Sequence, residues 1–311
     1  MNQAVESTRQ HGVLIDRSTS AELAIARVEG TRLLRNPFVW LAVVPSAMWA
    51  SDTKRALDDG EAEDVVHVLT GYLLLLPGFA TIVVVVLAVL RSRSAHADDL
   101  LDTLPVGRAQ RSVAHGWSTA ANALFGALIM AAAFVYLWPS STLGPFAEDA
   151  TLPWLEAPRP NVAQLLQGPI ALAAVTAGVV ALVRWVPTWL VLVPLPFLLM
   201  LQGLWFGMFN AATPSWFTWL WPLANGVVHD GYIGGCDEGG TCSLLLTGFD
   251  RTTPWWHIGY LLSLGTWFVT IAVLRNRRDR TAWTAFVVSL TTTVGFAIVQ
   301  AAVYVRPLYT Q

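Results

Sequence analysis

Long apolar runs without charged residues constrain this chain more than any other feature. Val65–Leu90 and Trp185–Phe209 contain no Asp, Glu, Lys or Arg. About 20 apolar residues are enough for a helix to cross the hydrocarbon layer of a membrane. Charged residues make up 13% of the chain, whereas soluble domains carry about 25%. The sequence therefore predicts an all-α polytopic membrane protein.

Six to seven transmembrane helices are expected from the distribution of these runs. The first candidate segment has only 13 residues, so it either begins inside a preceding helix or does not cross completely. The candidate segments are Phe38–Ala50, Val65–Leu90, Ser112–Trp138, Gln167–Val183, Trp185–Phe209, Trp256–Leu274 and Trp283–Val305.

The basic residues predict how these segments are oriented. Residues 1–20 are mostly polar and lack the apolar core of a secretory signal, so we expect a cytoplasmic N-terminus. With seven alternating spans, fourteen of the nineteen basic residues fall on one side, which the positive-inside rule assigns to the cytoplasm. The five expected on the opposite side are Lys54, Arg55, Arg159, Arg251 and Arg306.

The segment before the first span has features of an amphipathic helix. Thr19 and Glu22 have capping-box spacing, arginines alternate with aliphatic residues up to Arg35, and Asn36-Pro37 marks a break. Such a helix lies along the membrane interface. A cytoplasmic extension of the first spanning helix explains the pattern equally well.

A short polar island, Arg91–Arg111, separates two very hydrophobic segments. We expect a helix at residues 94–106, because acidic residues suit its first turn, Leu100, Leu101 and Leu104 share one face, and Pro105 ends it. Leucines exposed at a membrane surface need a protein groove or the lipid interface. A plain loop packed under the membrane is the alternative.

Two long loops, 139–166 and 210–255, are expected on the outer side. The second contains the only two cysteines, Cys236 and Cys242, and an oxidising exterior favours a disulfide between them. A metal site formed by His229, Asp230 and the two cysteines is the alternative, although the residues lack the spacing typical of metal ligands.

Several catalytic motifs are absent from the sequence. The only lysine, Lys54, lies in an expected outer loop, so the chain has no Walker A motif. It has neither an HExxH zinc motif nor a GxSxG nucleophile elbow. We therefore expect no catalytic residues, no metal, no cofactor and no nucleic-acid partner. If ATP drives the protein, a separate subunit binds it.

The span interiors contain neutral polar residues rather than charged ones. Asn122, Gln202 and Gln300 are the candidates for a substrate path. The lack of internal charge argues against coupling to protons or sodium ions and fits a bulky, largely apolar substrate. Hydrogen bonding between helices is the alternative role for each of these residues.

The chain resembles the membrane subunits of type-2 exporter ABC transporters. The resemblance covers residue 21 to about 274 and rests on AELAIARVEGTRLLRNP before the first span, on HADDLLDTLPVGRAQR after the second, and on the long outer loop after the fifth. It implies a permease core at 21–275. Residues 276–311 depart from the usual six spans by adding a basic loop and an extra transmembrane helix.

The resemblance also implies partners and a mechanism. Two permease chains, identical or different, pair in the bacterial plasma membrane, and two ATP-binding subunits hold ATP and Mg. Those subunits grip the coupling helix. Its expected contact residues are Asp98, Asp99, Leu100, Leu101, Asp102, Leu104, Pro105 and Arg108.

Two other classes of function stay open beside the exporter. One is a non-transporting membrane scaffold or sensor that binds a ligand or partner through its outer loops. The other is an intramembrane enzyme acting on lipid, for which His229, Asp230 and Asp250 are the best available candidates.

Overall fold

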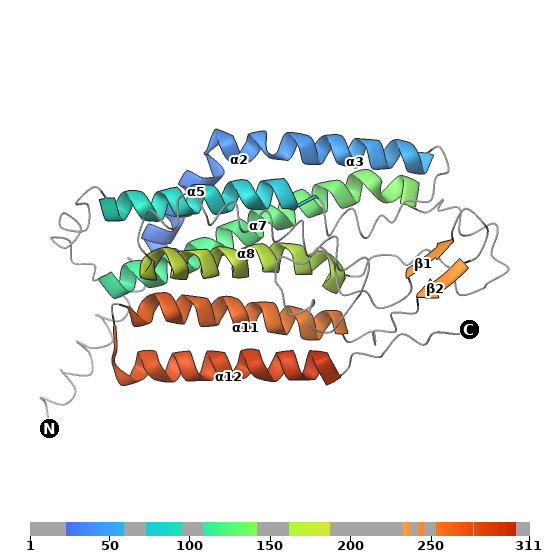
Figure 1. The fold of residues 1–311 in the computed structure, drawn as a ribbon. Helices are drawn as coiled ribbons and strands as arrows, with labels where there is room; N and C mark the ends of the chain where they lie inside the picture. Colours follow the sequence, from blue (N-terminus) through green and yellow to red (C-terminus); the bar gives the residue numbers. More distant parts are fainter. Residues whose placement is uncertain are drawn as a thin grey trace, which may run out of the picture.

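The computed structural model describes a bundle of roughly aligned helices with a small hairpin near one end (Figure 1). It describes residues 23–58, 73–94, 108–141, 162–186, 233–236, 242–245, 253–275 and 277–302. Apart from turns and the hairpin, these residues are helical. The expectation of a helical fold is confirmed for this part of the chain.

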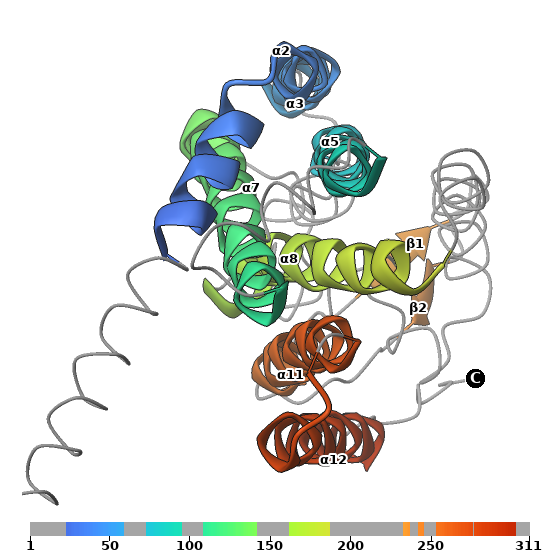
Figure 2. The same ribbon diagram turned by 90° about the vertical axis from the view of Figure 1, so that its left-hand side faces the viewer.

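The N-terminal helix, residues 23–34, lies across the bundle rather than along it (Figure 2). Its Gly30 faces the third predicted span, where a Cβ on this glycine would lie 3.0 Å from the Ala121 side chain. Leu33 is buried in a cluster with Val86 and Val89. Arg27, Arg32 and Arg35 are exposed. One side of this helix thus packs against the bundle.

A sharp break follows this helix. Asn36 caps the short helix α2, Pro37–Leu41, because its side-chain oxygen accepts a hydrogen bond from the Phe38 amide at 3.0 Å. Pro37 occupies the first helical position, where its missing N–H costs nothing. The chain therefore changes direction at the predicted Asn36-Pro37 break.

The first predicted span has different bounds from those expected. Helix α3, Val43–Asp58, follows α2 and continues eight residues beyond the predicted end at Ala50, so that it includes Lys54, which we expected in an outer loop. Ion pairs at helical spacing favour this extension: Lys54 with Asp58 at 3.9 Å and Arg55 with Asp52 at 3.6 Å. Neither α2 nor α3 is among the helices long and apolar enough to cross a membrane.

Five longer helices form the rest of the bundle. They are α5 (Leu75–Ser94), α7 (Arg108–Ser141), α8 (Val162–Trp185), α11 (Thr253–Leu274) and α12 (Arg280–Ala302).

Four of these helices contain segments that can cross a membrane, judged by length and composition. The segments are Thr119–Leu137, Leu165–Trp185, Trp255–Leu274 and Arg280–Ala302. They match the third, fourth, sixth and seventh predicted spans. In α5 the apolar stretch is shorter, Leu76–Leu90, and residues 65–72 of the second predicted span lie outside the described residues. So does the fifth span beyond Val186.

Helices α7 and α8 pack antiparallel. Asn122 contacts Thr176, and Gly126, one turn later in α7, faces Pro169, which comes earlier in α8. Helices α11 and α12 are also antiparallel and are joined by a short turn (Figure 1).

Helices α8 and α11, in contrast, run parallel. Gly265 approaches Ala174, and Phe268, three residues later in α11, meets Gly178 in α8. The Trp185 indole also donates a hydrogen bond to the Ile271 carbonyl at 3.0 Å, near the ends of both helices. The C-terminus of α8 and the N-terminus of α11 therefore lie at opposite ends of the bundle. The fifth predicted span falls in the chain between them.

The helix termini lie at two opposite ends of the bundle. The C-terminal ends of α5, α8 and α11 lie with the N-terminal ends of α7 and α12 at the left of Figure 1. The arginines at 91–93, 108–111, 184 and 275–280 occupy these helix ends. We call this the arginine-rich end. The alternation of helix directions places together nine of the fourteen basic residues that the sequence predicted on one side.

Helix α8 is the centre of the bundle and α12 its edge. Helix α8 packs against α5, α7 and α11, whereas α11 is the main partner of α12 (Figure 2). Within the candidate membrane-spanning segment of each helix, 61% of the most apolar stretch is buried in α8 but only 17% in α12. Between α5 and α8 the core consists largely of valines, including Val86, Val89 and Val179. Their stiff branched side chains fill the helix contact with little loss of rotamer freedom.

The two strands form an antiparallel hairpin, β1 (Ile233–Cys236) and β2 (Cys242–Leu245). Its register makes Cys236 and Cys242 direct partners. Opposite residues in antiparallel strands have Cα atoms about 4.5–5.5 Å apart, a separation that a disulfide can span. The two side chains lie outside the part described, so the disulfide stays a prediction.

The α8–α11 contact depends on a glycine. A Cβ on Gly265 would lie 3.2 Å from the Ala174 backbone, which cannot move aside as a side chain can. We expect Gly265→Leu to force the helices apart and to lower the free energy of unfolding by about 1–3 kcal/mol. Thermal unfolding of the purified protein measures this.

The matched control is Gly295→Leu on α12, because nothing lies within 4 Å of a Cβ there in the described structure. It should unfold like the wild type. Equal destabilisation by both substitutions would contradict a close α8–α11 contact.

Candidate functional site

The predicted coupling helix, 94–106, falls almost entirely outside the described residues, and with it Asp98, Asp99, Leu100, Leu101, Asp102, Leu104 and Pro105. The structure describes what flanks it. Helix α5 ends at Ser94 and helix α7 begins at Arg108, both at the arginine-rich end (Figure 1). The stretch that carries the acidic residues and leucines therefore connects two bundle helices at that end.

Asn122 lies in the middle of the α7–α8 contact and is fully buried. Its amide nitrogen donates to the Thr176 hydroxyl at 2.9 Å, and that hydroxyl donates to the Leu172 carbonyl at 2.7 Å. The side-chain oxygen of Asn122, Oδ1, has no partner among the described residues. Asn122 thus forms a hydrogen bond between helices, the role that we gave as the alternative to lining a substrate path. Its side-chain oxygen can still accept a hydrogen bond.

Gln300 occupies a similar position between α11 and α12. Its amide oxygen lies 3.3 Å from the Nδ1 atom of His257, and its amide nitrogen has no partner in the described part of the chain. Nearer the arginine-rich end, Thr270 and Ser289 face each other across the same contact at 3.2 Å. Gln202, the third candidate for a substrate path, lies outside the described residues.

Charged residues in the four candidate spans lie only at their ends. Arg184 comes one residue before the end of its span, and Arg280 starts the last one. Within the described ranges no three His, Cys, Asp or Glu residues are close enough to hold a metal ion. His229, Asp230 and Asp250, proposed for a metal site or an enzyme, are outside those ranges.

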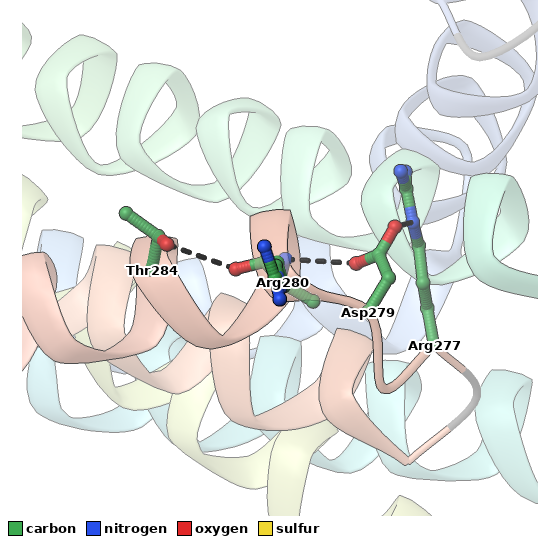
Figure 3. Close-up of polar contacts among 5 residues, drawn as sticks. Arg277, Asp279, Arg280 and Thr284 are labelled. Atoms are coloured by element: carbon green, nitrogen blue, oxygen red, sulfur yellow. Dashed lines mark hydrogen bonds and ion pairs between the residues drawn. The ribbon is translucent and has the colours of Figure 1, made fainter.

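The turn between α11 and α12 is built around Asp279 (Figure 3). One carboxylate oxygen accepts from the Ala282 amide at 2.9 Å and thereby caps α12. The other accepts from the Arg277 guanidinium at 2.6 Å. The Ala282 amide, followed by Arg277, holds the pKa of the Asp279 carboxyl below its usual range, since both stabilise the ionised form.

Sequence reasoning missed this cap and the hydrogen-bonding partner of Asn122. The cap had a local signal, because aspartate directly before an apolar helical segment is a common helix start. The Asn122–Thr176 pair had none, since its residues are 54 positions apart and belong to different helices.

No protein-family model, curated protein or solved structure matches this chain.

The Asn122–Thr176 bond should appear as a coupling energy. We expect Asn122→Ala and Thr176→Val to be non-additive by roughly 0.5–2 kcal/mol, as for other hydrogen bonds between membrane helices. The measurement is a double-mutant cycle on the free energy of unfolding in mixed detergent micelles. Thr266→Val is the control partner, because Thr266 is exposed and bonds its own helix at the Leu262 carbonyl. Additivity within about 0.3–0.5 kcal/mol in the Thr176 cycle would show that the bond is not formed.

Asp279 should make the stability of the α11–α12 turn depend on acidity. A carboxylate with a lowered folded pKa contributes its stability above the unfolded pKa, about 3.9, and loses it as the pH falls through the folded pKa. We expect Asp279→Ala to lower the unfolding temperature at pH 7 more than Asp279→Asn, which keeps a capping oxygen. The gap between wild type and the Asn variant should narrow as the pH falls below about 3.9, the unfolded pKa. A gap that stays constant as the pH falls below that value would contradict the assignment.

Proposed function

We propose that the chain is the membrane-embedded permease subunit of an ATP-driven exporter of the ABC class. In this proposal it moves a hydrophobic or amphiphilic substrate across the bacterial plasma membrane, and a separate subunit hydrolyses ATP. The N-terminus and the arginine-rich end face the cytoplasm, as the positive-inside rule requires.

The observation that carries the proposal is the position of the stretch between α5 and α7. Ser94 and Arg108 both lie at the arginine-rich end, so the sequence HADDLLDTLPVG is attached there by a bundle helix on each side. A short amphipathic helix at such a place is suited to a groove on a soluble partner. Because α5 and α7 both belong to the bundle, a push on this stretch would be transmitted to them directly.

The distribution of charge supports an apolar cargo. The four candidate spans carry charged side chains only at their ends, whereas ion-coupled carriers hold them inside the membrane. In this proposal Asn122, Gln202 and Gln300 offer neutral polar contacts along the path. The free acceptor of Asn122 and the free donor of Gln300 among the described residues fit that role.

The assembly contains two permease chains, identical or different, and two copies of an ATP-binding subunit that hold ATP and Mg. Dimerisation of those subunits on ATP would move the coupling helices and switch the path from inward- to outward-facing. In this proposal the chain contributes the substrate path and the coupling helix, and the ATP-binding subunit hydrolyses ATP.

The second candidate function is a non-transporting scaffold or sensor. It is favoured by the hairpin β1–β2, which belongs to the long loop 210–255 and lies at the end of the bundle opposite the arginines (Figure 1). An ordered hairpin in an external loop could bind a ligand or a partner protein.

Copurification separates the two candidates. We expect an ATP-binding cassette protein to copurify with the tagged chain in stoichiometric amount, together with ATPase activity. Leu101→Asp should weaken that association about tenfold or more, because burying a leucine contributes roughly 1.5–3 kcal/mol. Mass spectrometry of the purified complex and an ATPase assay measure both effects.

Leu152→Asp is the matched control, since it makes the same change in the loop expected on the other side of the membrane. It should leave the association intact. A well-folded chain with no ATPase partner would sink the exporter proposal, and binding of a ligand by the intact protein through the 210–255 loop would then favour the sensor.

A further inference from the structure

We propose that an anionic phospholipid binds along the outer face of α12, with its phosphate between Arg278 and Arg280 and an acyl chain on the apolar side chains below. This site is independent of the transport proposal. It requires only that α12 crosses a membrane.

None of the residues that the structure describes neutralises the positive charge at this site. Asp279 is the acidic residue of the turn, and both of its oxygens are engaged, one by the Ala282 amide and one by Arg277 (Figure 3). Arg278 and Arg280 are exposed and form no ion pair with any residue that the structure describes. Arg278 and Arg280 thus precede and follow, in the sequence, an aspartate whose two oxygens already have other partners. A phosphate would supply the missing negative charge, and arginine is well suited to bind it through two hydrogen bonds.

Trp283 lies one turn beyond Arg280 on the same face of α12. Its side chain is 51% exposed and rests edge-on against Phe286, with ring centroids 5.7 Å apart. Exposed tryptophans typically occupy the boundary between headgroups and hydrocarbon. Trp283 thus marks the depth at which a lipid headgroup would change into its acyl chains.

Below Trp283 the same face of α12 is largely apolar, with exposed Thr291 lying between Val287 and Val294. Val287, Val294 and Ile298 follow at helical spacing and are 53%, 47% and 63% exposed. The opposite face packs on α11 through the buried residues Ala282, Ser289, Thr293 and Gln300 and through the rings of Phe286 and Phe296. Helix α12 therefore buries the polar side chains of Ser289, Thr293 and Gln300 against α11 and leaves aliphatic side chains exposed on the outer side, which is the arrangement expected of a helix in contact with lipid chains.

Continuity of the two features identifies the occupant. The basic turn and the aliphatic face belong to one helix at the edge of the bundle, and only 17% of its most apolar stretch is buried (Figure 2). A soluble anion would use the arginines and leave the aliphatic face unexplained, whereas a zwitterionic lipid would cover that face without needing the arginines. An anionic phospholipid uses both, and basic sites at the cytoplasmic ends of helices bind such lipids.

Native mass spectrometry of the full chain in detergent tests the proposal with dioleoyl phosphatidylglycerol and dioleoyl phosphatidylcholine as probes. We expect tighter binding of phosphatidylglycerol. The double variant R278Q/R280Q should weaken that binding about tenfold to thirtyfold and leave phosphatidylcholine unaffected, because each arginine near a lipid surface contributes a comparable attraction. The control R55Q/R159Q removes the same charge from exposed Arg55 and from Arg159, which precedes α8 in the chain, and should leave phosphatidylglycerol binding unchanged.

Three results would overturn the proposal. One is undiminished phosphatidylglycerol binding by R278Q/R280Q. Another is an equal loss in the control, which would indicate net charge rather than a site. The third is displacement of the lipid by equimolar glycerophosphoglycerol, which has the headgroup without acyl chains and would indicate an anion site. If thermal unfolding shows that the double variant is not folded, the single variant R280Q is measured by the same criteria with R55Q as its control.

Discussion

The close approach of α8 to its neighbours is the constraint on which the rest of the bundle depends. In hydrocarbon, helices gain little from burying apolar surface, so they associate through close van der Waals contact and a few hydrogen bonds. Helix α8 supplies that contact on several sides: small residues face α11, a valine row faces α5, and Thr176 faces Asn122 on α7. Larger side chains on α8 would separate three helices at once. The position of α12 follows indirectly, because its main partner, α11, is held by α8.

The sequence predicted well what is encoded by local composition. Four of the seven candidate spans coincide with helices long and apolar enough to cross a membrane, and the break at Asn36-Pro37 lies where a capping side chain and a proline indicated it. The collection of arginines at one end also agrees with the structure, because alternation of helix directions follows from connectivity. The predicted end of the first helical segment, Ala50, was wrong, because α3 continues to Asp58. Its polar last turns looked like a loop, but ion pairs along the helix and the Lys54 ammonium, 5.3 Å from the Tyr136 ring centroid, favour helix there.

Pairing between distant residues could not be predicted from this sequence. Asn122 and Gln300 were recognised as polar residues in apolar segments, yet nothing local shows that one bonds a threonine of α8 and the other a histidine of α11. Such partners depend on the rotation of each helix about its axis, which small shifts in packing decide. For the proposed coupling helix the situation is reversed. The sequence shows its pattern of acidic residues and leucines, but these residues lie outside the part of the chain that the structure describes. The exporter proposal accordingly rests on pattern and on the location of the flanking helix ends.

The parallel arrangement of α8 and α11 has a consequence for biogenesis. Helix pairs α7–α8 and α11–α12 are antiparallel neighbours in sequence, so each can enter the membrane as a hairpin soon after it is synthesised. The joint between them brings Ala174 next to Gly265, residues 91 positions apart. That joint cannot exist until the ribosome has completed most of the chain. Helices α7 and α8 are therefore made well before α8 can meet its parallel partner, and the centre of the bundle is completed only after α11 has been synthesised.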